Sequence, residues 1–112
     1  MKKNLYIFIE HIIYSIEKIE EFTRNVSENE FDKNIQLQDA VVRRIEIIGE
    51  AAKNLPRDFT AKYQDIPWKE IIRTRDKIIH HYFGVNLDIV WNIIKISLPD
   101  LKKKLEKIKI DE

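Results

Sequence analysis

Cysteine is absent from the 112 residues, and glycine and proline are scarce, with two and three copies. The absence of cysteine excludes disulfide scaffolds, thiolate zinc sites and cysteine nucleophiles, and it fits a reducing, cytoplasmic location. Barrels, sandwiches and Rossmann-type folds need many tight turns, so the scarcity of glycine and proline favours long helices with few connections. The chain also lacks the long uninterrupted apolar run of a membrane span, and its first residues make a poor signal peptide.

The chain also lacks a large net charge, because its 20 basic residues nearly balance its 19 acidic ones. This balance does not indicate nucleic-acid binding, so any site for a polyanion must come from local clustering. Hydrophobic residues make up 44% of the chain, which is enough for a core, and charged residues make up 35%. A chain of this length, without a flexible linker, is expected to form a single domain over residues 1–112.

Apolar residues recur at helical spacing in four segments of the chain. The pattern predicts helices over about residues 3–24 and 37–55, from 68 towards Gly84 with a break within residues 80–86, and from 86 onward. Ser27 and Glu30 have the spacing of a capping box, Asn86 can cap the last helix, and Pro99 should kink or restart that helix. We therefore expect an all-α antiparallel bundle of four to five helices. Broad apolar faces on so short a chain leave surface for a partner, most simply a second copy in a homodimer.

The densest group of chemically active side chains lies in residues 71–86, IIRTRDKIIHHYFGVN. Histidine can take and return a proton near neutral pH, and arginine matches phosphate oxygens with a planar fork of donors. Together they could cleave RNA without a metal: a histidine deprotonates the 2′-hydroxyl, and arginine stabilises charge on the attacked phosphate. The candidate residues are Arg73, Arg75, Asp76, Lys77, His80, His81 and Tyr82.

Helical geometry limits how these residues can meet. At about 100° per residue, Arg75 and Tyr82 share nearly one face, whereas His80 lies about 140° from Arg75. Either the helix is distorted before Gly84, or two subunits bring their copies together across a two-fold axis. His81 could replace His80 or pair with Asp76, and the spacing alone does not decide between these roles.

Several other residues have a structural and a functional interpretation. A metal site from the paired histidines with Asp76 or Asp88 is disfavoured, because adjacent histidines point to different helix faces and no HExxH-like spacing occurs. Lys102 and Lys103 lie in a lysine-rich segment that is a solvated helix face or a contact to the RNA backbone. His11, among isoleucines, is expected to be a partly buried structural histidine.

The order and spacing of these residues resemble a known family. Arg75, His80 and Tyr82 match the arginine–histidine–x–tyrosine signature of the HepT-like branch of HEPN domains, which are small helical proteins and often toxins. IIGEAAKNLP at residues 47–56, DIPWKEIIRTRDKIIHHYFGVNLDIVW at 65–91 and LPDLKKKLEKI at 98–108 resemble the same family. The resemblance thus covers nearly the whole chain beyond its first third.

The resemblance implies a homodimeric HEPN bundle in which two copies of the motif line one cleft. It implies metal-independent endoribonuclease activity carried by Arg75 and His80, with Asp76 orienting the site and no cofactor. It also implies a toxin controlled by an antitoxin of the MntA nucleotidyltransferase type, which would add AMP to Tyr82. Phosphates attached beside Arg75 and His80 would block RNA.

Two other functions compete with this one. The chain could be a non-catalytic module that binds a nucleotidyltransferase partner or a nucleotide, although such a module would not need the Arg75, His80 and Tyr82 set. It could also be a housekeeping helical dimer without RNA, which would require the motif to be buried and mutually satisfied.

Overall fold

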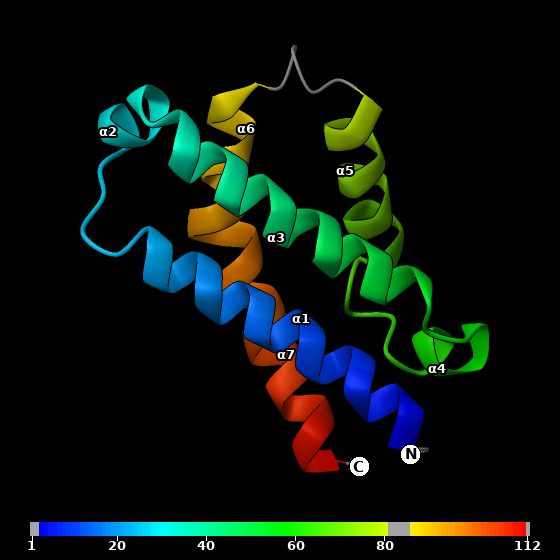
Figure 1. The fold of residues 1–112 in the computed structure, drawn as a ribbon. Coiled ribbons are helices and arrows are strands. Elements are labelled where there is room, and N and C mark those ends of the chain that lie inside the picture. Colours follow the sequence, from blue (N-terminus) through cyan, green and yellow to red (C-terminus); the bar gives the residue numbers. More distant parts are fainter. Residues whose placement is uncertain (1–2, 81–85, 112) are drawn as a thin grey trace.

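The computed structural model describes residues 3–80 and 86–111. Every regular element in this part of the chain is a helix. Four long rods form the frame, and two short helices connect them (Figure 1). The rods are α1 (Lys3–Phe22), α3 (Ile35–Lys53), α5 (Trp68–His80) and a continuous rod made of α6 (Leu87–Asn92), the π-helical turn η2 (Ile93–Ser97) and α7 (Leu98–Asp111). The short helices are α2 (Glu28–Lys33) and α4 (Arg57–Lys62). The expected all-α bundle is confirmed.

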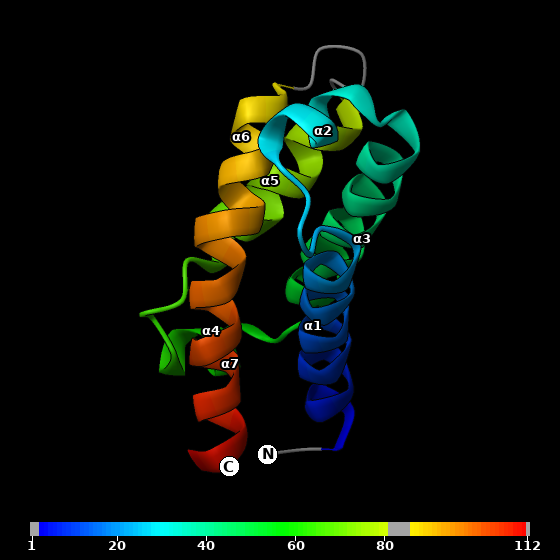
Figure 2. The same cartoon turned by 90° about the vertical axis from the view of Figure 1, so that its left-hand side faces the viewer.

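Helix α3 is the central element of the bundle. It runs antiparallel to α1 and packs against α5 on its other side, while α7 packs against α1 (Figures 1 and 2). Isoleucines at helical spacing in α1 supply much of the core, and they meet the apolar face of α3 around Val41, Ile45 and Ile48. Burying one such side chain stabilises the fold by about 1.5–3 kcal/mol.

The helix ends follow the predicted capping signals. The Ser27 hydroxyl accepts from the Glu30 backbone N–H at 3.1 Å, and the Glu30 carboxylate accepts from the Ser27 N–H at 3.0 Å, which completes the capping box. Hydrogen bonding of the Glu30 carboxylate, first with the Ser27 backbone N–H and then with the Ser27 side chain, lowers the pKa of Glu30 because it favours the ionised form. The Asn86 side chain accepts from the backbone N–H of Asp88 at 2.9 Å and so caps α6.

Pro99 neither ends nor restarts the last rod. The π-helical turn η2 lies immediately before α7, and the helix continues through the proline to Asp111. Because proline has no backbone N–H and its ring crowds the preceding turn, a widened turn lets the rod continue without a break. Within the described ranges, no helix combines the length and apolar character needed to cross a membrane.

Candidate functional site

Arg75 lies near the middle of α5, on the face that packs against α3. The backbone of α3 comes unusually close at this point because residue 49 is glycine. A Cβ atom placed on Gly49 would lie 2.7 Å from the Arg75 Cγ atom and closer still to its Cβ. Ordinary contact between carbon atoms is about 3.5–4.0 Å. Gly49 therefore lets α3 pack closely against α5, and the residue that it accommodates is Arg75.

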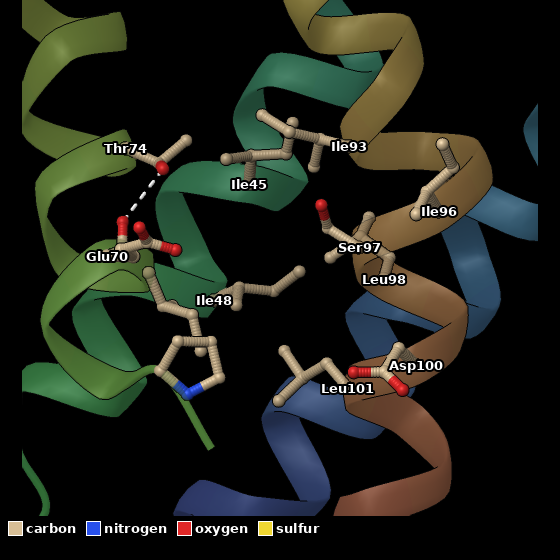
Figure 3. Close-up of a pocket in the computed structure, with 12 residues that line it drawn as sticks. Ile45, Ile48, Glu70, Thr74, Ile93, Ile96, Ser97, Leu98, Asp100 and Leu101 are labelled. Carbon is tan, nitrogen blue, oxygen red and sulfur yellow. Dashed lines mark hydrogen bonds between the residues drawn. The ribbon is translucent and has the colours of Figure 1, made fainter. Parts of the chain in front are cut away.

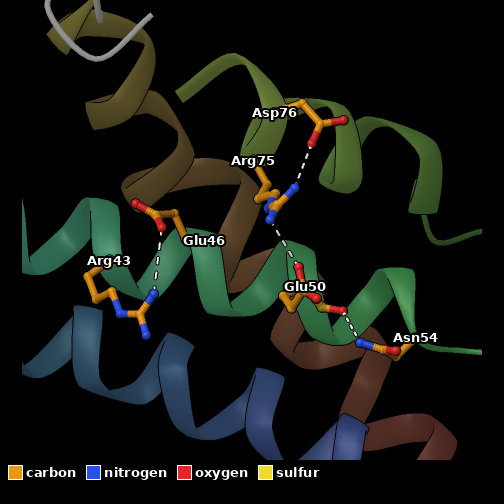
Figure 4. A network of polar contacts seen from close by, with 6 residues as sticks. All are labelled: Arg43, Glu46, Glu50, Asn54, Arg75 and Asp76. Atoms are coloured by element: carbon orange, nitrogen blue, oxygen red, sulfur yellow. Dashed lines mark hydrogen bonds and ion pairs between the residues drawn. The ribbon is translucent and has the colours of Figure 1, made fainter. Parts of the chain in front are cut away.

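Two carboxylates hold the guanidinium of Arg75 (Figure 4). Its Nη2 atom lies 3.1 Å from Oε2 of Glu50 on α3, and its Nη1 atom lies 3.0 Å from Oδ1 of Asp76. The Nε atom is buried and has no hydrogen-bond partner. Guanidinium has five N–H donors, so each terminal nitrogen keeps a second N–H for an incoming oxygen. The two ion pairs thus fix the guanidinium in place where α5 packs against α3.

Arg75 lies on an open cleft between α1, α3 and α5 with a volume of about 420 Å³. Only a quarter of its side chain is exposed, whereas Glu50 opposite is 55% exposed. Across the cleft, Arg43 pairs with Glu46 at 3.6 Å on α3 (Figure 4). The cleft is lined by Phe8, His11, Arg43, Glu46, Ile47, Glu50, Ala51, Asn54 and Arg75.

The structure corrects the expectation for His11. This residue is exposed on α1 and lines the cleft with Arg75, so it is not a partly buried structural histidine. Its isoleucine neighbours Ile9, Ile12 and Ile13 occupy the buried face of the helix. A step of about 100° per residue turns residue 11 away from them. The expected burial of His11 was wrong because residues that are adjacent in the sequence lie on different faces of a helix.

His80 is the last residue of α5, and its side chain lies outside the described part of the structure, as do His81 and Tyr82. The backbone of α5 is α-helical from Arg75 through His80. A regular helix separates these two positions by about 140° around the axis and about 7.5 Å along it. Between Arg75 and His80 the helix thus shows no distortion, and the alternative of a distortion further along, before Gly84, falls on residues outside the described ranges.

The other basic candidates lie away from this cleft. Arg73 and Lys77 are exposed, and helical geometry places them together on the face of α5 opposite Arg75. Lys102 of α7 contacts two glutamates of α1, with Nζ 3.0 Å from Glu20 and 3.6 Å from Glu17. The hydrogen bond to Glu20 raises the pKa of Lys102. Lys102 thus ties α7 to α1, while its neighbour Lys103 is exposed; RNA contact by these four residues stays a prediction.

Among the described residues, three exposed carboxylates lie close enough to share a cation, at the ends of α2 and α6. The oxygens of Glu28, Asp32 and Asp88 fall within 4.8 Å of one another. A hydrogen bond with Asp88 raises the pKa of Glu28, which is the behaviour of carboxylates that share a proton. None of the three lines the cleft of Arg75.

A second, largely apolar groove of about 380 Å³ lies between α3, α5 and the η2–α7 segment (Figure 3). Ile45, Ile48 and Leu101 line it. Ile96, at its edge on η2, is 66% exposed, and Ile89 on α6 is 58% exposed. This is the kind of uncovered apolar surface that the broad apolar helix faces predict.

The protein is an all-helical bundle in which two carboxylates hold an arginine at an open cleft. In the comparison with known proteins, a family model described as Ribonuclease HepT-like matches residues 12–108. The chain belongs to this HepT-like ribonuclease family.

Named relatives extend the match over nearly the whole chain. A Thermococcus cleftensis protein named "Probable ribonuclease HepT" is 46% identical over 109 residues, which are 97% of this chain and 99% of that protein. "Putative RNase MJ0127" of Methanocaldococcus jannaschii is 45% identical over 96% of this chain and 88% of its own length. "Gamma-glutamylcyclotransferase and putative RNase MJ0434" of the same organism is 51% identical over 96% of this chain, which spans only 49% of that longer relative. No solved structure matches the chain significantly.

The sequence missed one member of the site. Glu50 pairs directly with Arg75, although the two lie on different helices. Its only signal in the sequence is its position after Gly49 in the segment IIGEAAKNLP, which carries part of the family resemblance.

Proposed function

We propose that this protein is an endoribonuclease that cleaves RNA without a metal, using Arg75 and His80 in a cleft formed by a homodimer. Arg75 stabilises the charge that develops on the attacked phosphate, and the imidazole of His80 transfers protons. The observation that carries the proposal is the Arg75 guanidinium, which two carboxylates and the Gly49 contact hold at an open cleft. Membership in the HepT-like ribonuclease family and the names of the relatives support the same reaction.

A second copy of the chain completes the site in this proposal. The unbroken helix between Arg75 and His80 supports an arrangement in which one subunit supplies the arginine and the other supplies the histidine. The apolar groove and the exposed Ile89 and Ile96 offer surface that a partner could cover. A catalytically competent monomer would contradict this part of the proposal.

Single substitutions test the enzyme. Arg75→Ala and His80→Ala should each lower RNA cleavage by about 10²–10⁴-fold, the range for loss of a charge-stabilising or proton-transferring group. Arg24→Ala is the matched control, because Arg24 is exposed near the end of α1 and does not line the cleft. Circular dichroism and light scattering should show unchanged helix content and assembly. Unchanged cleavage in both variants would contradict the roles of Arg75 and His80, and a wild-type protein that cleaves no RNA would favour the non-catalytic interaction module.

The biological role that we propose is that of a toxin in a two-gene system, silenced by a nucleotidyltransferase antitoxin of the MntA type. Such an enzyme would add AMP to Tyr82, and the added phosphates would compete with RNA for Arg75 and His80. Mass spectrometry of the protein co-expressed with the antitoxin tests this step, with Tyr82→Phe as the control. Silenced growth inhibition without any added mass would show that the antitoxin masks the site by binding.

A further inference from the structure

RNA cleavage through the 2′-hydroxyl needs two proton transfers. The arginine–histidine–x–tyrosine signature contains one histidine, His80, in each subunit. One group must remove the proton of the attacking 2′-hydroxyl, and another must return a proton to the departing 5′ oxygen. We propose that Glu50 is the general base of this reaction and that His80 is its general acid. This inference rests on the proposed function and adds a catalytic residue to it.

The position of Glu50 relative to Arg75 carries the proposal. Its Oε2 atom lies 3.1 Å from the Arg75 Nη2 atom, so it is adjacent to the donor that would hold a phosphate oxygen (Figure 4). The attacking 2′-oxygen lies next to that phosphate in every RNA strand. The Glu50 side chain is 55% exposed and lines the cleft, so an incoming ribose can reach its carboxylate. Asp76, the other carboxylate on Arg75, does not line the cleft.

Charged and titratable groups from three helices surround Glu50 in the cleft. Arg75 faces it from α5 with Asp76 beside it, and His11 faces the same cleft from α1. Arg43 and Glu46 precede it on α3 and are paired with each other.

The reaction balances with these two groups. The Glu50 carboxylate takes the proton of the 2′-hydroxyl, and the 2′-oxygen forms a bond to phosphorus. The bond between phosphorus and the 5′ oxygen breaks, and the leaving oxygen takes a proton from the His80 imidazolium. The products are a 2′,3′-cyclic phosphate and a 5′-hydroxyl end, and no other reactant is needed. Arg75 stabilises the additional negative charge on the phosphate during the transfer.

The competing arrangement uses two imidazoles, one from each subunit, as base and acid. The two arrangements differ in the acid limb of the pH–rate profile. An imidazole base gives a limb near the ordinary imidazole pKa of about 6.5, whereas a carboxylate base gives one at lower pH. The decisive measurement is single-turnover cleavage of an oligoribonucleotide between pH 4 and pH 9 by the full-length dimer.

Glu50→Gln keeps the shape of the side chain and removes the base. We expect it to lower single-turnover cleavage by about 10²–10⁴-fold and to abolish the acid limb. Its binding of a 2′-O-methyl oligonucleotide, which cannot react, should be unchanged or tighter, because a negative charge is lost. Glu50→Asp should restore part of the rate together with the acid limb. Glu21→Gln, on α1 and paired with Lys18 away from the cleft, is the matched control.

A Glu50→Gln variant that cleaves at the wild-type rate would overturn the proposal. So would a slow variant that keeps the acid limb, because that result would mean that Glu50 only positions Arg75. A wild-type acid limb near pH 6.5 would also overturn it, in favour of two imidazoles. These failures leave the proposed function intact as long as Arg75→Ala and His80→Ala abolish cleavage; if those variants cleave normally, the proposed function itself has failed.

Discussion

Replacing Gly49 with alanine should damage catalysis far more than stability. The new Cβ would lie 2.7 Å from the Arg75 Cγ atom, about 1 Å inside ordinary carbon contact, so α3 and α5 must separate or Arg75 must move. Overpacking of this kind lowers the unfolding free energy by about 1–3 kcal/mol. Alanine is more favourable than glycine inside a helix by about 1 kcal/mol, which offsets part of this loss. The net loss of unfolding free energy is therefore small, at about 0–2 kcal/mol. A misplacement of about 1 Å at a catalytic group, however, costs about 10²-fold in rate.

Urea unfolding and RNA cleavage measured on the same preparations separate these two effects. The control uses Arg75→Gly, which removes the three atoms that would lie nearest to the new Cβ. In that background Gly49→Ala should become stabilising by about 1 kcal/mol, since only the helix propensity remains. Wild-type cleavage by Gly49→Ala, or the same stability change in both backgrounds, would refute the close contact between residue 49 and Arg75.

Two further predictions concern the tie between α7 and α1 and the role of metal. Lys102→Ala should lower the unfolding free energy by up to about 1 kcal/mol in urea titrations, because it removes contacts to Glu17 and Glu20, whereas exposed Lys103→Ala should have little effect. The hydrogen bond to Glu20 raises the pKa of Lys102, so this contribution is fully present below the ordinary lysine pKa of about 10.4 and is lost as the pH rises through the folded value. Equal stability of the Lys102 variant and the wild type would count against the tie. RNA cleavage should persist after exhaustive treatment with EDTA, and loss that magnesium or zinc restores would indicate a metal site.

Much of the fold could be predicted because it depends on local patterns. Apolar spacing located the long helices, and the Ser27–Glu30 and Asn86 caps marked two helix starts that the structure contains. The response to Pro99 was not predictable in detail. A kink, a restart and a π-helical turn all relieve the same steric clash, and the local sequence does not decide among them.

The candidate site could be predicted only where its residues share a segment. Arg75 and Asp76 were candidates because their chemistry is concentrated in one stretch of sequence. Glu50 lies on a different helix, and only the close packing of α3 and α5 at Gly49 brings it to Arg75. The spacing of residues in the sequence does not indicate this contact between Glu50 and Arg75.

Subunit complementation tests the central claim most directly, since the account requires Arg75 of one subunit to act with His80 of the other. Arg75→Ala and His80→Ala proteins are each expected to be inactive, but a mixture refolded together should contain heterodimers in about half of its molecules. Each heterodimer would have one intact site of two, so the mixture should recover about one quarter of the wild-type cleavage rate. A mixture as inactive as its two components would contradict a shared site.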